Sequence, residues 1–330
     1  MKNSKILLLS LLSAFLFFAS CDEDEVTNLI PNIESTTLAT ELGEYVNIDP
    51  FPAMITAEGV NTAILTSANI AIIDIRSEEA FIAGHITGAV NVAFGDLLTY
   101  YEANNLDANT TVAIACYSGQ TASYGSSLLR MLGYTNVKAL KWGMSSWSDA
   151  TSSKWLDALS NGKAALMSTE AGTKNAIGSL PVISTGEATG NAILRARVEK
   201  MFTDGFGTAT ITNSDAFTNS NTNYTVNYWK EEHYNVGHIP GAVQYTPKSS
   251  LSFTQELLTL PTDKTVVVYC YTGQTSAFMT AYLKVLGYDA KTLLYGANGM
   301  MYDVMHDYTG ASSFTYFKDS YIMDYTVATK

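Results

Sequence analysis

Two cysteines, Cys116 and Cys270, stand in surroundings that favour a reactive thiol. Each follows a short apolar run and precedes a loop that contains hydroxyl groups and a glycine. The loops read Tyr117-Ser118-Gly119-Gln120-Thr121 and Tyr271-Thr272-Gly273-Gln274-Thr275. If each loop opens a helix, its backbone N–H groups and the positive end of the helix dipole converge on the sulfur and stabilise a thiolate or a bound anion. The pattern predicts two nucleophilic cysteines; inert cysteines at the ends of core strands are the alternative.

Both cysteines belong to a sequence unit that occurs twice. Residues 78–90 match residues 231–243 at 8 of 13 positions, and residues 111–134 match residues 265–288 at 11 of 24. The two pairs of blocks keep the same spacing to within one residue, so the chain contains a duplication. The cysteines hold equivalent places in their copies, which argues against a disulfide between them unless the two sites face each other.

The elements around each cysteine alternate between strands and helices. Continuous apolar runs at residues 70–75, 112–115 and 266–269 predict strands that are buried on both faces of a parallel sheet. A helical pattern follows each cysteine loop and ends at Gly133 or Gly287. We therefore expect an α/β fold of two tandem domains, each an open, mostly parallel sheet with helices on both faces. Ligands bind beyond the carboxyl ends of such strands, where both cysteines lie.

The length of 330 residues predicts two domains with cores of their own. We place them at residues 41–155 and 188–330, with a linker at residues 156–187 that is rich in small and polar residues. A helix is expected over residues 191–202, and an extended polar loop over residues 212–223 precedes a strand at residues 224–229.

The first residues predict an export signal. Lys2 and Lys5 form a positive segment, residues 6–20 are apolar, and Cys21 follows small residues. The apolar run is too short to favour a membrane-spanning helix, and the pattern resembles the lipobox of bacterial lipoproteins. We expect a signal peptide over residues 1–20, a lipid on Cys21 and an acidic tether over residues 21–40. The acidic residues resemble the tether of Bacteroidetes lipoproteins, which predicts a lipid-anchored protein of the bacterial cell envelope, at the outer membrane and facing either the periplasm or the outside. A plain signal peptide that ends near a cysteine is the alternative.

Taken in order, the repeated blocks resemble the rhodanese domain. In the first copy the resemblance rests on Asp74-Ile75-Arg76 and on residues 84–89, 116–121 and 140–143. In the second copy it rests on residues 237–242, 270–275 and 294–296. It covers most of residues 45–150 and 220–305.

The resemblance implies sulfurtransferase chemistry. In rhodaneses the loop cysteine takes the outer sulfur of thiosulfate or a similar donor, keeps it as a persulfide and passes it to cyanide or a thiol. Cys116 and Cys270 would be the nucleophiles, and the backbone amides of residues 117–121 and 271–275 would bind the donor and the persulfide. The hydroxyls of Ser118, Thr121, Thr272 and Thr275 would be available to assist. The implied partners are a small sulfur-containing anion and a thiol acceptor, and the chemistry needs neither a metal nor an organic cofactor.

Several features limit this interpretation. Both loops lack a basic residue beside the cysteine, and Asn227 and Trp229 replace Asp74 and Arg76 in the second copy. A binding or sulfur-carrying module without turnover is therefore the alternative function. A cysteine phosphatase needs an arginine about six residues after its nucleophile to bind phosphate. Neither loop has one, which argues against that class.

Charge and the remaining polar residues favour structural roles. The formal net charge of −12 argues against a nucleic-acid-binding protein, which needs a basic face. We expect His85 and His238 to be hydrogen-bonded in glycine-flanked turns, and the glutamate pairs at residues 78–79 and 231–232 to begin helices. The tryptophans are expected in cores and interfaces.

Overall fold

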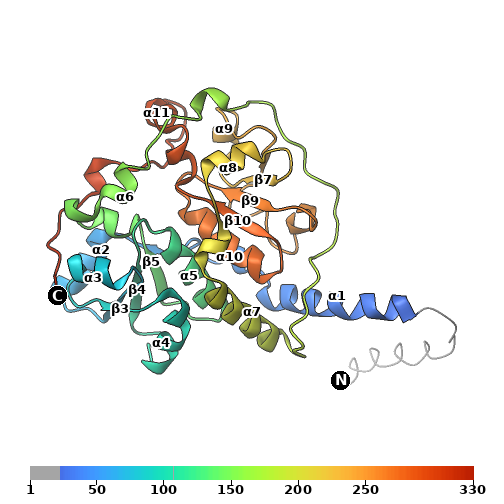
Figure 1. The fold of residues 1–330 in the computed structure, drawn as a ribbon, viewed down its shortest axis with the longest axis horizontal. Helices are drawn as coiled ribbons and strands as arrows, with labels where there is room; N and C mark the ends of the chain where they lie inside the picture. The colour runs from blue at the N-terminus through green and yellow to red at the C-terminus, as the bar shows by residue number, and fades with distance from the viewer. Residues whose placement is uncertain (1–22, 107) are drawn as a thin grey trace, which may run out of the picture.

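The computed structural model describes residues 23–106 and 108–330. The predicted signal peptide and the predicted lipidation site, Cys21, lie outside these residues. Within them the chain forms two five-stranded sheets in which every neighbouring pair of strands is parallel. The predicted α/β fold of two tandem domains is confirmed (Figure 1).

The first sheet has the strand order β1-β5-β4-β2-β3. Its strands are β1 (Met54–Ile55), β2 (Ile70–Asp74), β3 (Val90–Asn91), β4 (Thr111–Ala115) and β5 (Val137–Leu140). Its helices are α2 (Ala57–Leu65), α3 (Glu78–Ala83), α4 (Leu97–Ala103) and α5 (Gln120–Met131). The central strand β4 ends one residue before Cys116, so that cysteine lies at the carboxyl ends of the parallel strands.

The second sheet repeats this order as β6-β10-β9-β7-β8. Its strands are β6 (Thr210–Ile211), β7 (Tyr224–Asn227), β8 (Val243–Gln244), β9 (Val266–Tyr269) and β10 (Ala290–Leu293). Its helices are α8 (Asn213–Thr218), α9 (Glu231–Tyr234), α10 (Gln274–Val285) and α11 (Tyr302–Asp307). Helix α8 corrects the predicted extended loop: the Thr212 hydroxyl caps it by accepting a hydrogen bond from the Asp215 N–H.

The two domains share one inner core, so the prediction of separate cores is wrong in part. Helices α5 and α10 pack against each other between the sheets (Figure 1). One continuous cluster of buried residues joins the inner sides of both sheets, with Val112 and Ile114 from β4 and Val266 and Val268 from β9. The alternate residues of each strand face separate outer clusters, as the period of two along a strand requires.

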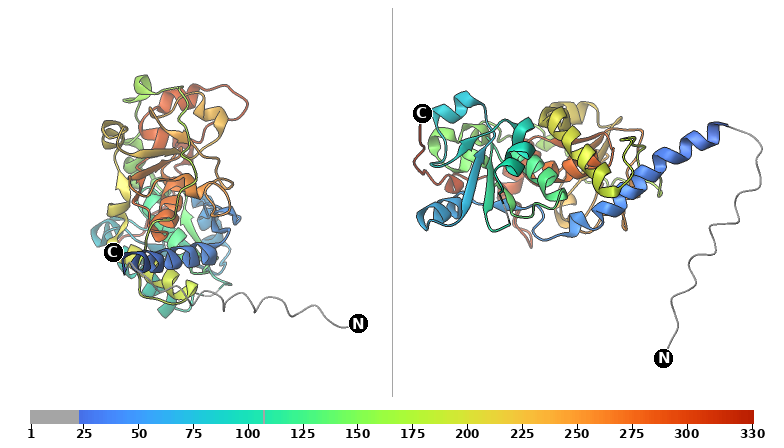
Figure 2. Two further views of the ribbon diagram at one scale, coloured as in Figure 1. Left: turned by 90° about the vertical axis from the view of Figure 1, so that its right-hand side faces the viewer. Right: turned by 90° about the horizontal axis from the view of Figure 1, so that it is seen from below.

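The segment predicted as a tether is partly helical and partly packed. Helix α1 (Glu23–Leu42) leads away from the body at its N-terminal end (Figure 2). Near its C-terminal end Leu38 and Ala39 are buried, and the Ser35 hydroxyl donates a 2.6 Å hydrogen bond to the Pro181 carbonyl. The packed body therefore begins before residue 41. Helix α7 (Gly190–Asp204), the predicted helix at residues 191–202, packs against α1.

Each domain is completed by a segment that follows the other domain. After helix α6 (Ser153–Leu156), the chain crosses to the second domain, where Ser168 and His238 form an antiparallel bridge. After α11 the chain returns to the first domain, where Ala328 and His85 form the equivalent bridge. The C-terminus consequently lies beside α3 (Figure 1). None of the helices in the described part of the chain is long and apolar enough to cross a membrane.

Candidate active site

Cys116 sits at the mouth of a helix, as its sequence context predicts. Its Sγ accepts hydrogen bonds from the backbone N–H groups of Gly119 (3.1 Å) and Ala122 (3.3 Å). Gly119 takes the left-handed conformation, with φ of 84°, and this turn starts α5 directly after it. The loop therefore wraps its amides around the sulfur, which is the arrangement that stabilises negative charge on sulfur or on a bound anion.

Cys270 occupies the equivalent place with fewer donors around it. Its Sγ accepts a 3.3 Å hydrogen bond from the Ser276 N–H and lies 3.9 Å from the Thr272 hydroxyl oxygen. Gly273 again takes the left-handed conformation, with φ of 76°, before α10. Cys116 and Cys270 are both free thiols in this structure.

A glycine in the turn after the next strand, β5 or β10, lies against the backbone of each cysteine loop. A Cβ on Gly143 would lie 2.5 Å from the carbonyl oxygen of Cys116, and Gly143 has φ of 61°. The next residue, Met144, donates its N–H to that same carbonyl at 2.8 Å. Gly296 holds the corresponding position under the Cys270 loop. Close backbone contact here fixes the direction in which each loop presents its amides.

The two loops are tied to each other through their glutamines. Gln120 Oε1 accepts a 2.8 Å hydrogen bond from the Tyr295 N–H of the second domain. Gln274 Oε1 accepts an equally long one from the Trp142 N–H of the first domain. Both side chains are 1% exposed. The side chains of both glutamines therefore join the two domains. The predicted binding of substrate by the backbone amides of these residues stays a prediction.

The Cys116 loop is also covered by aromatic residues. Trp155, which follows the first domain, donates its Nε1–H to the Ser118 carbonyl at 3.0 Å. Tyr295 packs edge-on against Trp155, with ring centroids 5.1 Å apart. Burial, with a contribution from the nearby Cys116, raises the pKa of Tyr295. The surroundings of the first loop are thus built from both domains, and no local sequence pattern marks Trp155.

The other loop residues differ in their exposure. Ser118 and Thr272 are buried, and their hydroxyls accept hydrogen bonds from Gln120 Nε2 (2.9 Å) and the Gln274 N–H (3.2 Å). Thr121 and Thr275 are half-buried in the first turns of α5 and α10. The predicted assistance by these hydroxyls stays a prediction.

A cavity of about 220 Å³ adjoins the first loop through Tyr117. Arg76 and Lys154 line it, and each cationic group lies 5.7 Å from the centroid of the Tyr117 ring. The Arg76 guanidinium forms a 2.7 Å ion pair with Asp74, and both side chains are almost fully buried. Lys154 is exposed on α6. A cavity with two cationic side chains in its lining therefore lies beside Tyr117, the residue that follows Cys116. No sequence pattern marks Lys154 as part of this lining.

At the second site the equivalent positions are filled with aromatic rings. Trp229 replaces Arg76 and stacks on Tyr271 with 5.1 Å between ring centroids. His233 replaces Ala80 and stacks on Phe314 at 3.8 Å. The Tyr271 hydroxyl lies 2.6 Å from His233 Nδ1. The two sites thus differ in their surroundings far more than in their loops.

The pKa of the first thiol runs against the expectation from its loop. Burial raises the pKa of Cys116, and the nearby Asp74 charge acts in the same direction. The backbone amides of Ala122, Ser118 and Gly119 lower it but do not offset the burial. Helix position alone therefore does not yield a thiolate at neutral pH in the free protein, because Cys116 is only 2% exposed.

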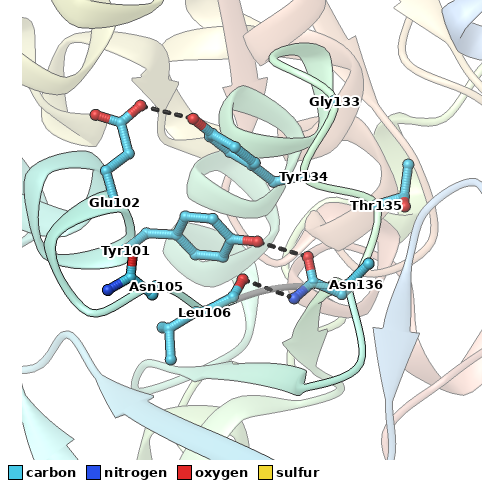
Figure 3. Close-up of a pocket in the computed structure, with 9 residues that line it drawn as sticks. Tyr101, Glu102, Asn105, Leu106, Gly133, Tyr134, Thr135 and Asn136 are labelled. Atoms are coloured by element: carbon cyan, nitrogen blue, oxygen red, sulfur yellow. Dashed lines mark hydrogen bonds between the residues drawn. The ribbon is translucent and has the colours of Figure 1, made fainter.

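A larger cavity of about 400 Å³ lies at the opposite edge of the first sheet (Figure 3). It is lined by residues at the end of α4 and by residues 133–136, which precede β5, so it faces the amino ends of the parallel strands. Its polar groups already bind one another. Tyr134 donates its hydroxyl to Glu102 at 2.6 Å and Tyr101 donates to Asn136 Oδ1 at 2.7 Å. Because Cys116 follows the carboxyl end of β4, this cavity lies at the other end of the strands from the thiol.

The remaining predicted residues take structural positions. His85 and His238 contact the carbonyls of Phe81 and Tyr234 through Nδ1. The glutamate pairs begin α3 and α9 as predicted. In residues 23–106 and 108–330, no group of three or more histidine, cysteine, aspartate or glutamate side chains is arranged to hold a metal ion.

Two segments of this chain match a known protein family. A family model described as the rhodanese-like domain matches residues 59–150 and 226–301, just over half of the chain. The chain belongs to the rhodanese-like family. Both matched segments contain their copy's cysteine, its loop and the preceding strand.

Relatives of this rhodanese-like chain are named as sulfurtransferases. Thiosulfate sulfurtransferase GlpE of Pseudomonas entomophila (strain L48) is 30% identical over 107 residues, which cover 32% of this chain and 87% of the relative. GlpE of Pseudomonas fluorescens (strain SBW25) is 34% identical over 76 residues, 23% of this chain and 68% of the relative. A solved thiosulfate sulfurtransferase from Pseudomonas aeruginosa is 18% identical with a TM-score of 0.32, covering 84% of this chain and 47% of that one.

Proposed function

We propose that this rhodanese-like protein is a sulfurtransferase whose working nucleophile is Cys116. The observation that carries the proposal is the pair of amide hydrogen bonds to Cys116 Sγ, together with a cavity beside the neighbouring Tyr117 that Lys154 lines. Cys270 has one such amide bond, and aromatic rings pack around its loop. The names of the relatives support the same class of chemistry.

The reaction has two displacements at sulfur. The Cys116 thiolate attacks the outer sulfur of thiosulfate, or the sulfane sulfur of a persulfide or polysulfide. A new S–S bond forms at the enzyme while the donor's S–S bond breaks. When thiosulfate is the donor, sulfite is the leaving group. The thiolate of an acceptor then attacks the outer sulfur of the enzyme persulfide and leaves with it, which regenerates the Cys116 thiolate. Charge and sulfur balance in each step, and the loop amides stabilise the anionic sulfur throughout.

Burial of Cys116 sets a condition on the first step. Because burial raises the pKa of the thiol, donor binding must accompany loss of its proton. The loop amides, rather than a basic side chain in the loop, meet the negative charge of the donor.

Thiosulfate:cyanide sulfurtransfer by the soluble chain that starts after Cys21 tests the proposal, with intact-mass measurement of the persulfide. We expect the wild type to turn over and to gain about 32 Da, the mass of one sulfur, on Cys116. Cys116→Ser should abolish both signals, and Cys270→Ser, the matched control in the other copy, should keep both. Absence of turnover and of any adduct with thiosulfate, polysulfide or a thiol persulfide would leave a non-catalytic binding or sulfur-carrying module.

We also propose that Cys21 carries a lipid that anchors the protein in the bacterial cell envelope, at the outer membrane. The support is the charged, apolar and small-residue order of residues 2–21. Expression of the full chain in a lipoprotein-competent bacterium, followed by detergent partitioning, tests it. The wild type should enter the detergent phase, whereas Cys21→Ser should remain in the aqueous phase; equal partitioning would contradict the anchor.

A further inference from the structure

The cavity beside the Cys116 loop combines apolar walls with two cationic side chains. Ala80, Ala83, Ala150 and Val327 supply methyl groups to the lining, together with Thr151, Ser153 and the ring of Tyr117. Two cations, Arg76 and Lys154, line it, and the described lining contains no carboxylate. A wholly polar anion such as thiosulfate has no aliphatic group that could pack against these methyl groups. The lining instead fits a molecule with a short aliphatic part and a charged end.

The charge of the cavity rests on Lys154. Arg76 is neutralised by Asp74 at 2.7 Å, and its NH2 group also donates to the Gly84 carbonyl at 2.6 Å. Its guanidinium is thereby held in place with its charge balanced. The Lys154 ammonium lies 5.7 Å from the centroid of the Tyr117 ring. Within the described residues it forms no ion pair with a carboxylate. In a chain with a formal net charge of −12, an uncompensated lysine beside the reactive loop stands out.

The size of the cavity sets the size of its occupant. A volume of about 220 Å³ equals that of about seven liquid water molecules. This is room for the few heavy atoms of a small thiol that carries a carboxylate. At the equivalent positions of the second copy, the larger rings of Trp229 and His233 stand in place of Arg76 and Ala80.

Resting on the proposed sulfur transfer at Cys116, we propose that this cavity binds the organic part of a small, anionic thiol acceptor. The methyl groups of α3 and of the C-terminal segment contact its aliphatic part. Lys154 pairs with its carboxylate and makes the enzyme select anionic over neutral thiols in the second displacement.

Discharge of a preloaded persulfide tests the selection. The protein is loaded on Cys116 with polysulfide, in a Cys270→Ser background, and loading is checked by intact mass. Transfer is then measured to 3-mercaptopropionate (anionic), 2-mercaptoethanol (neutral) and cysteamine (cationic), with rates expressed per thiolate. Lys154→Ala should raise KM for 3-mercaptopropionate about fivefold, the size expected for one partly exposed ion pair, and should leave the neutral thiol unchanged. Lys154→Glu should reverse the order of the two charged thiols.

Lys163→Ala is the matched control. Its Nζ also lies beside an aromatic ring, 5.4 Å from the Phe217 centroid, but in the segment that covers the second domain. It should change none of the three reactions. High salt should reduce the preference for 3-mercaptopropionate in the wild type and have little effect on Lys154→Ala.

Two different failures are distinguishable. If the loading step puts no sulfur on Cys116, the proposed function itself fails. If loading succeeds but Lys154→Ala changes all three acceptors equally, or changes none, the acceptor site is refuted while sulfur transfer stands.

Discussion

Replacing Gln274 by leucine in the second domain should loosen the thiol loop of the first. Gln274 Oε1 accepts the Trp142 N–H at 2.8 Å, and leucine keeps the volume of the side chain but removes this acceptor. A buried N–H without a partner costs about 1–3 kcal/mol, so we expect the free energy of unfolding to fall by about this amount. Trp142 leads into Gly143, whose backbone lies against the Cys116 loop, and Cys116 should therefore react faster with iodoacetamide.

The assay combines urea unfolding, followed by tryptophan fluorescence, with alkylation of Cys116 in a Cys270→Ser background. Gln255→Leu is the control, because Gln255 is exposed and its replacement should change stability by no more than about 0.5 kcal/mol. Gln120→Leu should cost at least as much as Gln274→Leu, since Gln120 Nε2 also donates to the Ser118 hydroxyl at 2.9 Å. If Gln274→Leu matches the Gln255→Leu control in both stability and alkylation rate, the glutamine bridge does not support the site.

Three further predictions concern the same loop and its cover. Because burial raises the pKa of Cys116, its alkylation rate should keep increasing above about pH 10, where an exposed thiol with a pKa of about 8.5 is almost fully ionised. The unfolded chain ionises first, so the free energy of unfolding should also decline as the pH rises above the ordinary thiol pKa; a plateau of the alkylation rate at or below about pH 10 contradicts this. Gly143→Ala should lower the free energy of unfolding by about 2 kcal/mol or more in thermal unfolding, because φ is 61° and the Cβ would clash with the Cys116 carbonyl. Gly207→Ala is the control and should be nearly neutral, because there is open space around its Cβ; equal effects of the two variants would contradict the close contact. Deleting residues 323–330 removes the N–H donors of Met323, Tyr325 and Ala328 and should cost about 3 kcal/mol, seen as a lower melting temperature; an unchanged melting temperature would show that this segment does not stabilise the first domain.

The elements that position the cysteines could be predicted from local patterns. Apolar runs marked β2, β4 and β9, and the glycines at residues 133 and 287 marked the helix ends, where φ is 93° and 100°. These signals are local because a buried strand and a helix C-terminus each impose their own residue types over a few positions. Helix α8 was missed because its polar composition resembles a loop, and its cap, Thr212, has the same residue type as many loop threonines.

The contacts that distinguish the two sites could not be predicted in this way. Lys154 and Trp155 reach the first loop from a segment outside the repeat, and Phe314 reaches the second loop from beyond α11. Each contact depends on how distant segments pack, which leaves no period or motif in the sequence. The direction of the Cys116 pKa was missed for the same reason, since helix position was visible in the sequence and the depth of burial was not.

The exchange of C-terminal segments bears on the order in which the chain is made. Trp147 Nε1 of the first domain donates to the Thr326 carbonyl, and the His85 N–H donates to the Ala328 carbonyl. A ribosome that adds about 5–20 residues per second makes Ala328 roughly 10–40 s after Trp147. During that time the first repeat has been made but lacks the segment that pairs with His85. Its outer face is therefore closed only after the second repeat has been made, and a chain shortened before residue 323 would keep the Cys116 loop while lacking the segment that covers this face.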